Sequence, residues 1–524
     1  MVFENELTWF KALNSGKSEE FHRKYEEALE KVKKEFGKKY PNIIDGKEVH
    51  SEEGEFVKTS PSDTRIVLGY FQKGTRDDVR KAVEAAKRAF PLWSSMPYYE
   101  RVKIFRKATD ISSQRKYEIA AFMSMENGKN RFEAIADVDE GIDLIRFYCE
   151  EMEVNKGYEK EMGKAFPNEK AKSVMKPYGV WGVISPFNFP FAIAIGMSSG
   201  ALITGNTVVF KPSSDTPLTG FKICEILHEA GLPKGVFNYV SGSGDIVGAE
   251  LVNNDDVAGI VFTGSRDVGV SSHKAFNDKH PRPFIAEMGG KNPVIVTSKA
   301  DLDKAVEGVT RSAFGYSGQK CSACSRVYVD KRVKKDFVER LVKRTKELVI
   351  GDSTLKDSFI SPLINQRAYR NYQSYIEIAK KDGKILTGGR VLTDEKHKYG
   401  YFVEPTIVDG LPKDHRLFKD ELFVPIVCIA EANSLDEAIK LSNDVDYGLC
   451  AGIFTEDKKE IKKFFNEIQA GVIYANRKVG ATTGAMPGAQ PFVGWKLSGS
   501  SGKGAGGIYY LHQFLREQSQ TIVH

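Results

Sequence analysis

The fold of this chain is most constrained by an alternation of short apolar runs with helical segments, which begins near residue 180 and extends almost to residue 476. One series consists of VWGVIS, TVVFKP, VFNYVSG and GIVFTGS within residues 180–265, with FKICEILHEAG as an intervening helix. A second series consists of FIAEMGG, NPVIVTS, SRVYVD, PIVCIAE and GVIYAN within residues 284–476. Apolar strands separated by helices are typical of parallel sheets with both faces covered. The sequence therefore predicts an α/β fold with two doubly wound parallel-sheet domains.

The regions outside this alternation follow other patterns. Residues 19–38 have the spacing of an exposed amphipathic helix, residues 40–49 read as a hairpin, and helices dominate up to about residue 154. The C-terminal FLREQSQTIVH alternates like an edge strand, which needs a partner. We divide the chain into an N-terminal helical extension (1–38), a first α/β domain (39–286), a second α/β domain (287–480) and a C-terminal segment (481–524).

Composition excludes several classes of protein. The formal charge of +6, from 76 basic and 70 acidic residues, is spread along the chain, so neither a nucleic acid nor a membrane surface is implied as a partner. The six cysteines are mostly isolated and MVFENELTWF lacks an export signal, which favours a reducing, cytoplasmic location. The uncharged stretch 177–210 is long enough to span a bilayer, but its internal prolines and glycines favour a buried strand, loop and helix.

One cysteine stands in a polar, glycine-rich loop, GYSGQKCSACSR. A thiolate nucleophile needs such a partly exposed setting, and Cys321 has it. A buried structural cysteine is the ordinary alternative, as for the apolar surroundings of Cys224 and Cys428. Cys321 and Cys324 also form a C-x-x-C pair, which is compatible with a dithiol redox site or half of a zinc site. No matching second ligand pair is present, so we expect no metal.

Further polar groups lie where strands are expected to end. SGSGDIVG (241–248) and FTGSRDVG (262–269) each follow a strand and open a helix, so each is either a phosphate site or a plain strand-to-helix turn. Neither has the G-x-G-x-x-G spacing. Asn188 brings amide donors to the apolar loop SPFNFPF. Glu287, at the end of FIAE, is either a base with a raised pKa or a solvated strand-end carboxylate.

These segments together resemble the aldehyde dehydrogenase superfamily over essentially the whole chain. The segments that carry the resemblance are SPFNFP (185–190), GNTVVFKPS (205–213), FTGSRDVG (262–269), EMGGKNP (287–293), GQKCSA (318–323), GYFVEPT (400–406), NDVDYGL (443–449) and the region of Pro491 and Phe492. The resemblance implies an aldehyde dehydrogenase-like fold, in which the first domain (39–286) binds NAD(P), the second (287–480) is catalytic, and an arm near 157–175 with the C-terminal strand forms a homo-oligomer, at least a dimer.

The resemblance also implies roles for individual residues. Cys321 would attack a small-molecule aldehyde, the Asn188 amide and the Cys321 N–H would stabilise the oxyanion, and Glu287 would activate the water that releases a carboxylic acid. The residues implied to bind the cofactor are Ser185, Phe187, Lys211, Ser213, Ser214, Gly244, Gly248, Phe262, Gly264, Ser265, Glu421 and Phe423. NAD-preferring members usually have glutamate at the position of Ser214, so we expect both NADP and NAD to be used, with NADP favoured.

Three features resemble one branch of the superfamily, the 1-pyrroline-5-carboxylate dehydrogenases of proline catabolism. They are the N-terminal helix leading to YPNIIDGKEV, the serine after the nucleophile, and NRKVGATTGAMPGAQPF (476–492). The substrate-binding residues that this branch implies are Glu140, Phe189, Ser322, Gly484, Ala485 and Phe492, with Ser322, Gly484 and Ala485 on a carboxylate. The chain departs from the usual pattern at Val424 and Val493, which stand in place of glycines and add β-branched side chains close to the expected active site.

Other functions remain open from the sequence alone. One alternative is an aldehyde dehydrogenase whose substrate is another small aldehyde, such as glyceraldehyde or succinate semialdehyde. Two alternatives belong to other functional classes. One is a thiol redox sensor that uses Cys321 and Cys324, and the other is a scaffold that has the fold without the activity. Intact Cys321, Glu287 and Asn188 argue against the scaffold.

Overall fold

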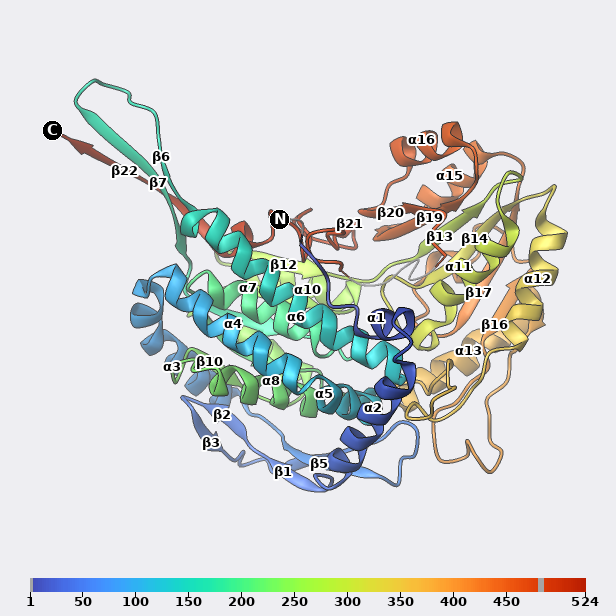
Figure 1. Cartoon of the computed structure of the whole chain (residues 1–524), viewed down its shortest axis with the longest axis horizontal. Coiled ribbons are helices and arrows are strands. Elements are labelled where there is room, and N and C mark those ends of the chain that lie inside the picture. Colours follow the sequence, from blue (N-terminus) through green and yellow to red (C-terminus); the bar gives the residue numbers. More distant parts are fainter. Residues whose placement is uncertain (1–2, 479–484) are drawn as a thin grey trace.

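The computed structural model describes residues 3–478 and 485–524. Two α/β bodies lie side by side and a long ribbon projects from the first of them (Figure 1). The first body contains a seven-stranded sheet in the order β12-β11-β8-β9-β10-β2-β3. Its strands are β2 (Asn42–Ile44), β3 (Lys47–Val49), β8 (Val180–Ile184), β9 (Thr207–Lys211), β10 (Phe237–Tyr239), β11 (Val257–Thr263) and β12 (Phe284–Glu287). All pairs from β10 to β12 are parallel, whereas β2 and β3 form the expected antiparallel hairpin.

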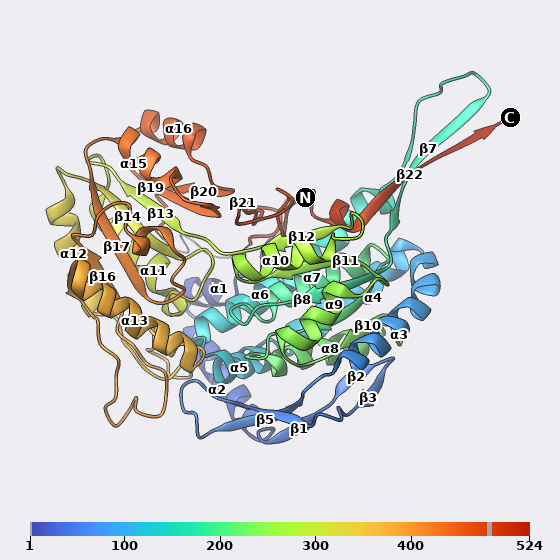
Figure 2. The same cartoon turned by 180° about the vertical axis from the view of Figure 1, so that it is seen from behind.

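Helices cover both faces of the first sheet. The helices α7 (Ala192–Ile203) and α8 (Pro217–Glu229) pack on one face, beneath an outer layer of α4 (Tyr98–Gln114), α5 (Lys116–Asn127) and α6 (Arg131–Val154). The other face carries α3 (Arg76–Ser95), α9 (Ala249–Asn253) and α10 (Arg266–Phe276) (Figure 2). Residues 177–210 are thus a buried strand, loop and helix, as expected. Within the described residues, no helix combines the length and apolar content needed to cross a membrane.

The second body repeats this architecture. Its sheet has the order β15-β16-β17-β14-β13-β19-β20, and only β15 is antiparallel to its neighbour. Its strands are β13 (Asn292–Val296), β14 (Cys324–Asp330), β15 (Lys384–Thr387), β16 (Thr406–Asp409), β17 (Ile426–Ala432), β19 (Cys450–Phe454) and β20 (Val472–Ala475). Its helices are α11 (Leu302–Phe314), α12 (Lys334–Lys346), α13 (Gln366–Asp382), α15 (Leu435–Asn443) and α16 (Lys458–Glu467). The expected α/β fold with two parallel-sheet domains is confirmed.

One predicted strand, FIAE, belongs to the first sheet, whereas its place in the apolar series predicted the second sheet. The run FIAE, expected to open the second series, is β12, and it pairs with β11 at the edge of the first sheet. The second sheet begins only with β13 at Asn292. The chain therefore crosses between the two bodies over residues 288–291, directly after Glu287. That crossing places Glu287 at the seam between the bodies.

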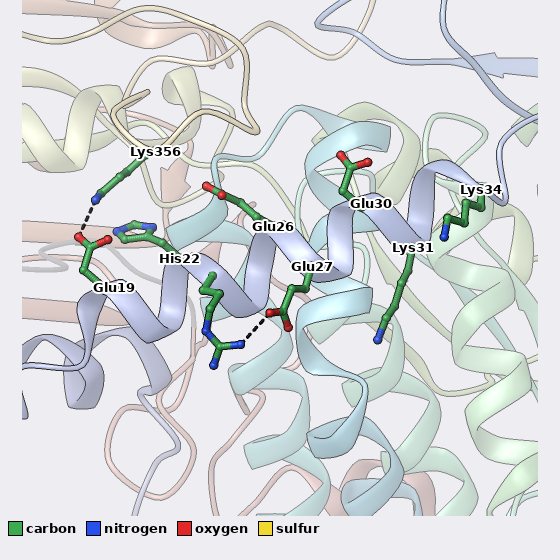
Figure 3. A pocket seen from close by; sticks show the side chains of 9 residues that line it. Glu19, His22, Glu26, Glu27, Glu30, Lys31, Lys34 and Lys356 are labelled. Carbon is green, nitrogen blue, oxygen red and sulfur yellow. Dashed lines mark hydrogen bonds and ion pairs between the residues drawn. The ribbon is translucent and has the colours of Figure 1, made fainter.

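The N-terminal extension is the amphipathic element that the sequence predicts. In α2 (Ser18–Lys33) the inward side chains Phe21, Tyr25 and Val32 are buried against the helical layer. Charged side chains on the outer face line a shallow open groove that reaches Lys356, which pairs with Glu19 at 2.7 Å (Figure 3). A three-stranded sheet of β1 (Lys38–Tyr40), β5 (Val67–Gln72) and β4 (Glu55–Thr59) follows.

The projecting ribbon combines the C-terminus with an internal hairpin. The strand β22 (Leu515–Val523) pairs antiparallel with β7 (Glu169–Pro177), which also pairs with β6 (Glu159–Glu161). Near the tip, the side chains of Ile522 and Val523 are 61% and 63% exposed. The C-terminal edge strand predicted from the sequence is therefore present, in a ribbon that extends away from the body.

Candidate active site

A cavity lies where the carboxyl ends of the first sheet meet the Cys321 loop of the second body. It brings together many residues that the sequence singled out, namely Glu140, Phe189, Phe262, Glu287, Cys321, Ser322, Ala485 and Phe492. It also includes residues that the sequence analysis missed, namely Leu144, Ala192, Ile193, Gly196, Met197, Val261, Thr263, Ile285, Ala505 and Tyr510. Most of the missed residues are apolar and lie on elements with a clear core role, so they gave no signal of their own. The cavity is mainly apolar, with a thiol and two carboxyl groups directed into it.

The loop that carries Cys321 is held in an unusual backbone conformation. Tyr316 and Ser317 have left-handed φ values of 49° and 53°, a strained region for non-glycine residues. The Tyr316 hydroxyl donates to the Asn127 carbonyl at 2.7 Å, and the Ser317 hydroxyl donates to the Ser361 carbonyl at 2.5 Å. These buried bonds fix the loop that precedes the thiol.

The Cys321 thiol is partly buried, and hydrogen bonds to the main chain of its loop hold it in place. The Asn292 amide donates to the Cys321 carbonyl at 2.7 Å and to the Ala323 carbonyl at 2.9 Å. Burial raises the pKa of the thiol well above its ordinary value, and the nearby carboxyl groups of Glu421 and Glu287 add to that rise. Cys324 is buried at the start of β14, and both cysteines are free thiols.

Glu287 ends β12 and lines the same cavity. Its carboxylate oxygen Oε2 accepts the Gly494 N–H at 3.0 Å. Burial raises the pKa of this carboxyl well above its ordinary value, and that single main-chain bond opposes the rise only in part. A carboxyl group with such a pKa, beside a thiol, has the properties expected of a general base rather than of a solvated strand-end carboxylate.

The helix α6 presents three acidic side chains to the active-site segments. Glu133 accepts two bonds from Lys320, at 2.8 and 2.6 Å, and Lys320 directly precedes Cys321. Asp137 accepts from Lys129 at 2.8 Å and from the Ala192 N–H at 2.7 Å. The spacing of Glu133, Asp137 and Glu140 on one helical face is visible in RFEAIADVDEG, although only Glu140 was predicted as a site residue.

The third acidic residue of α6 is Glu140. It accepts the Ala485 N–H at 3.0 Å. Burial, with a further contribution from Asp137, raises the pKa of Glu140 to about 8. Helix α6 thus contacts the Cys321 loop, the start of α7 and the Ala485 segment.

Asn188 is buried in the loop between β8 and α7. The neighbouring Phe189 lines the cavity, whereas Asn188 itself is absent from the described cavity lining. The Lys129 ammonium lies 3.4 Å from the centre of the Phe189 ring, a cation–π contact that fixes this loop. The Asn127 amide also donates to the Phe187 carbonyl at 3.1 Å.

The end of β9 forms a cradle suited to a dinucleotide. Lys211 is buried, its ammonium donates to the Pro212 carbonyl at 2.9 Å, and burial lowers its pKa to about 8. A Cβ atom on Gly248 would lie 3.7 Å from the Lys211 side chain, whereas one on Gly244 would meet no atom within 4 Å. Ser214, which donates to the Gly242 carbonyl at 2.9 Å, is exposed, and the Ser213 hydroxyl accepts the Asp215 N–H at 3.2 Å. A buried cation beside open glycine backbone fits a phosphorylated ribose.

The other cofactor candidates cluster at the strand ends and across the seam. The Gly264 N–H donates to the Glu287 carbonyl at 3.1 Å, and a Cβ atom on Gly264 would lie 2.6 Å from the Phe262 ring. Ser265 occupies the N-cap position of α10 without a side-chain capping bond, and Ser185 donates its N–H to the Lys211 carbonyl at 3.2 Å.

Two candidates from the second body complete this surface. Glu421 accepts the Gly290 N–H at 2.9 Å, and burial raises its pKa to about 7. Phe423, at a left-handed φ of 58°, packs edge-on against Phe187 with ring centres 5.8 Å apart. The residues present therefore fit a bound NAD(P) that spans the seam between the two bodies.

Two further expectations concern the rim of the cavity. Val424 is 4% exposed and packs in the core of the second body, and the Val493 carbonyl lies close to Gly471. Neither valine is among the described residues that line the cavity, although Phe492, which directly precedes Val493, is. Gly484, expected beside the substrate carboxylate, lies outside the described residues.

Comparison with known proteins agrees with this geometry. The model of the aldehyde dehydrogenase family matches residues 49–520. The chain belongs to this family, whose members are NAD(P)-dependent oxidoreductases that act on aldehydes. It is 40% identical to a 1-pyrroline-5-carboxylate dehydrogenase of Geobacillus sp. (strain WCH70) over 95% of each chain.

Solved structures give the same result. A 1-pyrroline-5-carboxylate dehydrogenase from Thermus with bound NAD superposes with a TM-score of 0.91 at 36% identity, over 96% of each chain. An E. coli NADP dependent enzyme superposes with a TM-score of 0.86 at 30% identity, over 94% of this chain and 99% of that chain.

Proposed function

We propose that the enzyme oxidises L-glutamate γ-semialdehyde, the open form of 1-pyrroline-5-carboxylate, to L-glutamate with NAD(P) in proline catabolism. The observation that carries this proposal is the single cavity that contains the Cys321 thiol, the Glu287 carboxyl and the Ala485 segment. The relatives named 1-pyrroline-5-carboxylate dehydrogenase support the same substrate. Residues 39–286 then bind the cofactor and residues 287–480 carry the nucleophile.

The first chemical step belongs to Cys321. Its sulfur forms a bond to the aldehyde carbon, the thiol proton passes to solvent, and the electron pair of the carbonyl π bond moves to the oxygen, which becomes an oxyanion. The Cys321 N–H and the Asn188 amide are assigned to stabilise that oxyanion. Bound NAD(P) supplies the acceptor for the hydride that leaves the same carbon, so a thioester remains on Cys321.

The second step belongs to Glu287. Its carboxylate takes a proton from water, the hydroxide adds to the thioester carbon, and the carbon–sulfur bond breaks. The products are the carboxylic acid and the regenerated thiol. Since burial raises the pKa of Glu287, its carboxylate is a stronger base than an exposed glutamate would be.

The opposite end of the cavity suits an amino acid chain. Ser322 and Ala485, with Gly484, are assigned to the α-carboxylate, because main-chain N–H groups and a hydroxyl are good carboxylate donors. Phe189 and Phe492 flank the aliphatic part, and Glu140 lies where it can accept the α-ammonium group. The cofactor side has Ser214 where NAD-preferring members usually have glutamate, so a 2′-phosphate meets no like charge at that position and NADP is accepted beside NAD.

We also propose a homo-oligomer and a cytoplasmic location. The β6–β7–β22 ribbon presents Ile522 and Val523 to solvent, and an exposed strand edge needs a partner. All six cysteines are free thiols, in agreement with a reducing compartment.

Steady-state kinetics test this function. We would compare kcat/KM for 1-pyrroline-5-carboxylate, glyceraldehyde and succinate semialdehyde, each with NAD and with NADP. A preference of about tenfold or more for pyrroline carboxylate, about 1.4 kcal/mol at the transition state, supports the proposal. A preference for either other aldehyde leaves the family reaction in place and refutes the substrate assignment.

A further inference from the structure

Residues 3–8, which we call the N-terminal strap, lie beside the substrate-binding end of the cavity. Both views place the start of the described chain next to the C-terminal segment that precedes β22 (Figures 1 and 2). The strap precedes residue 49, where the match to the family model begins. No role in the family reaction is therefore assigned to it by that match.

The strap is fixed to α6 by a dense set of polar contacts. The Thr8 N–H and hydroxyl donate to Asp139 at 2.6 and 2.7 Å, and the Glu6 N–H donates to Asp143 at 2.8 Å. The Glu6 carboxylate pairs with Lys116 at 3.0 Å and also with Arg146. Main-chain bonds to buried carboxylates leave this segment little freedom.

The first residues of the strap contact the turn at residues 485–490, which we call the anchor turn. The Asn5 amide donates to the Pro487 carbonyl at 3.3 Å. Gly488 has a left-handed φ of +73°, and a Cβ atom there would lie 3.0 Å from the Phe3 side chain and 3.3 Å from Phe147. Phe3 and Phe147 themselves meet edge-on, with ring centres 5.5 Å apart. Phe3 and α6 therefore enclose the middle of the anchor turn.

The anchor turn is connected to the cavity through its first residue. The main chains of Met486 and Gln490 exchange two hydrogen bonds, at 3.0 and 2.7 Å, and Gly488 donates to Gly506 at 3.0 Å. Ala485 then lines the cavity and donates its N–H to Glu140 at 3.0 Å. A shift of the turn consequently moves the Ala485 main chain within the cavity.

We propose that the N-terminal strap is a specificity element, which fixes the anchor turn so that the Ala485 segment can bind a carboxylate-bearing aldehyde. This inference rests on the proposed function, in which the Ala485 segment receives the α-carboxylate. Phe3 and Asn5 are positioning residues. They stand apart from Cys321 and Glu287, so the strap acts on the choice of substrate and leaves the chemical step unchanged.

The first test uses the full chain with Phe3→Ala and Asn5→Ala combined, and Asn5→Ala alone as a milder variant. We would measure the ratio of kcat/KM for 1-pyrroline-5-carboxylate to that for propanal, which has no carboxylate. The ratio is expected to fall about tenfold in the double variant, through KM, because a displaced binding group loses the contacts that depend on its position. The matched control is Phe10→Ala, on α1 (Thr8–Asn14), whose side chain is 53% exposed.

A second readout does not depend on the substrate. The N–H groups of Ala485, Met486, Gly488, Ala489 and Gln490 all donate hydrogen bonds, so hydrogen exchange reports directly on the anchor turn. Exchange is expected to be about tenfold faster or more in the double variant and unchanged in Phe10→Ala.

The outcomes separate the two proposals. A wild-type ratio near one refutes the proposed function, and the strap inference falls with it. If the wild type has a high ratio of kcat/KM for 1-pyrroline-5-carboxylate to that for propanal and the double variant retains it, the strap inference is wrong and the proposed function stands. Unchanged exchange at residues 485–490 overturns it as well, whatever the substrate proves to be.

Discussion

The two ends of the cavity are built in different ways. At the reacting end, Cys321 and Glu287 lie directly beside the parallel sheets, where the Asn292 side-chain amide holds the Cys321 carbonyl and the Gly494 N–H holds the Glu287 carboxyl group. At the anchoring end, Glu140 and Ala485 come from a helix and from a segment near the C-terminus, and the N-terminal strap supports them. In the proposed function, the strand ends carry the chemistry, while the selectivity depends on segments that can vary without disturbing the sheets.

Each end contains a carboxyl group with a raised pKa, and the two groups serve different purposes. Glu287 is raised well above its ordinary pKa by burial, and it must lose its proton to act as a base. Glu140 is raised to about 8 by burial and by Asp137, and it accepts a main-chain N–H that holds the anchor segment. Variants at the reacting end should therefore lower the rate with every aldehyde, whereas variants at the anchoring end should change the preference among aldehydes.

The largest effect is expected from Cys321→Ser. A serine hydroxyl is a far weaker nucleophile at neutral pH than a thiol that can become a thiolate, so kcat should fall by about 10⁴-fold or more with every aldehyde. Binding of NAD(P), followed by fluorescence or calorimetry, should be unaffected. Appreciable turnover by this variant would refute the assignment of the nucleophile.

The next effect is expected from Glu287→Gln, which retains the shape of the side chain and removes the base. Loss of a general base costs about 10²–10⁴-fold, so hydrolysis of the acyl enzyme should become rate-limiting. A burst of NAD(P)H followed by a slow steady state would show this in stopped-flow absorbance.

The pH profile sharpens the same assignment. Because the active form of Glu287 is the carboxylate and burial raises its pKa, the wild-type steady-state rate should still rise with pH above the range in which an ordinary glutamate titrates. In Glu287→Gln that dependence should disappear from the hydrolytic step. A variant profile that retains the wild-type shape in this step would contradict the role of Glu287.

The reacting end could be predicted from the sequence to a greater extent than the anchoring end. The two parallel sheets, the hairpin at 40–49 and the C-terminal strand all follow from local apolar patterns. Thr263 at the end of β11 lies opposite Glu287 at the end of β12, because the two parallel strands are neighbours in the first sheet. The apolar alternation did not predict this proximity. The alternation does not say which sheet a strand joins, which is why FIAE was placed in the second series.

The anchoring end depends on contacts that no local pattern encodes. Asn5 and Pro487 are separated by 482 positions in the chain. Asp137 and Lys129 are charged residues of the kind usually found on a solvated helix surface. In the structure both side chains are 0% exposed and form an ion pair with each other. A charged residue is usually exposed, so a single sequence favours the wrong environment for such groups.

A smaller effect is expected from Ser322→Ala, at the junction of the two ends. Removal of one hydroxyl donor to a carboxylate costs about 1.5–3 kcal/mol, so kcat/KM for 1-pyrroline-5-carboxylate should fall by about 10-fold to 150-fold. The loss should appear mainly in KM, and propanal should be affected by less than about threefold. An equal loss with both aldehydes would place Ser322 in the reacting end instead.

The smallest effect is expected on stability, from Glu140→Gln. The pKa of Glu140 is raised from 4.5 to about 8 on folding, so between these values the folded state binds more protons than the unfolded state. Wild-type stability therefore decreases as pH rises through this window. Glutamine stays neutral and retains an oxygen that accepts the Ala485 N–H, so the variant avoids that decrease. The Tm of the variant should equal that of the wild type near pH 4.5 and exceed it by about 1–3 °C at pH 8. If the difference in Tm between the variant and the wild type does not change with pH, Glu140 is ionised in the folded enzyme. The anchoring end then carries a full negative charge, which can pair with the α-ammonium group of the substrate.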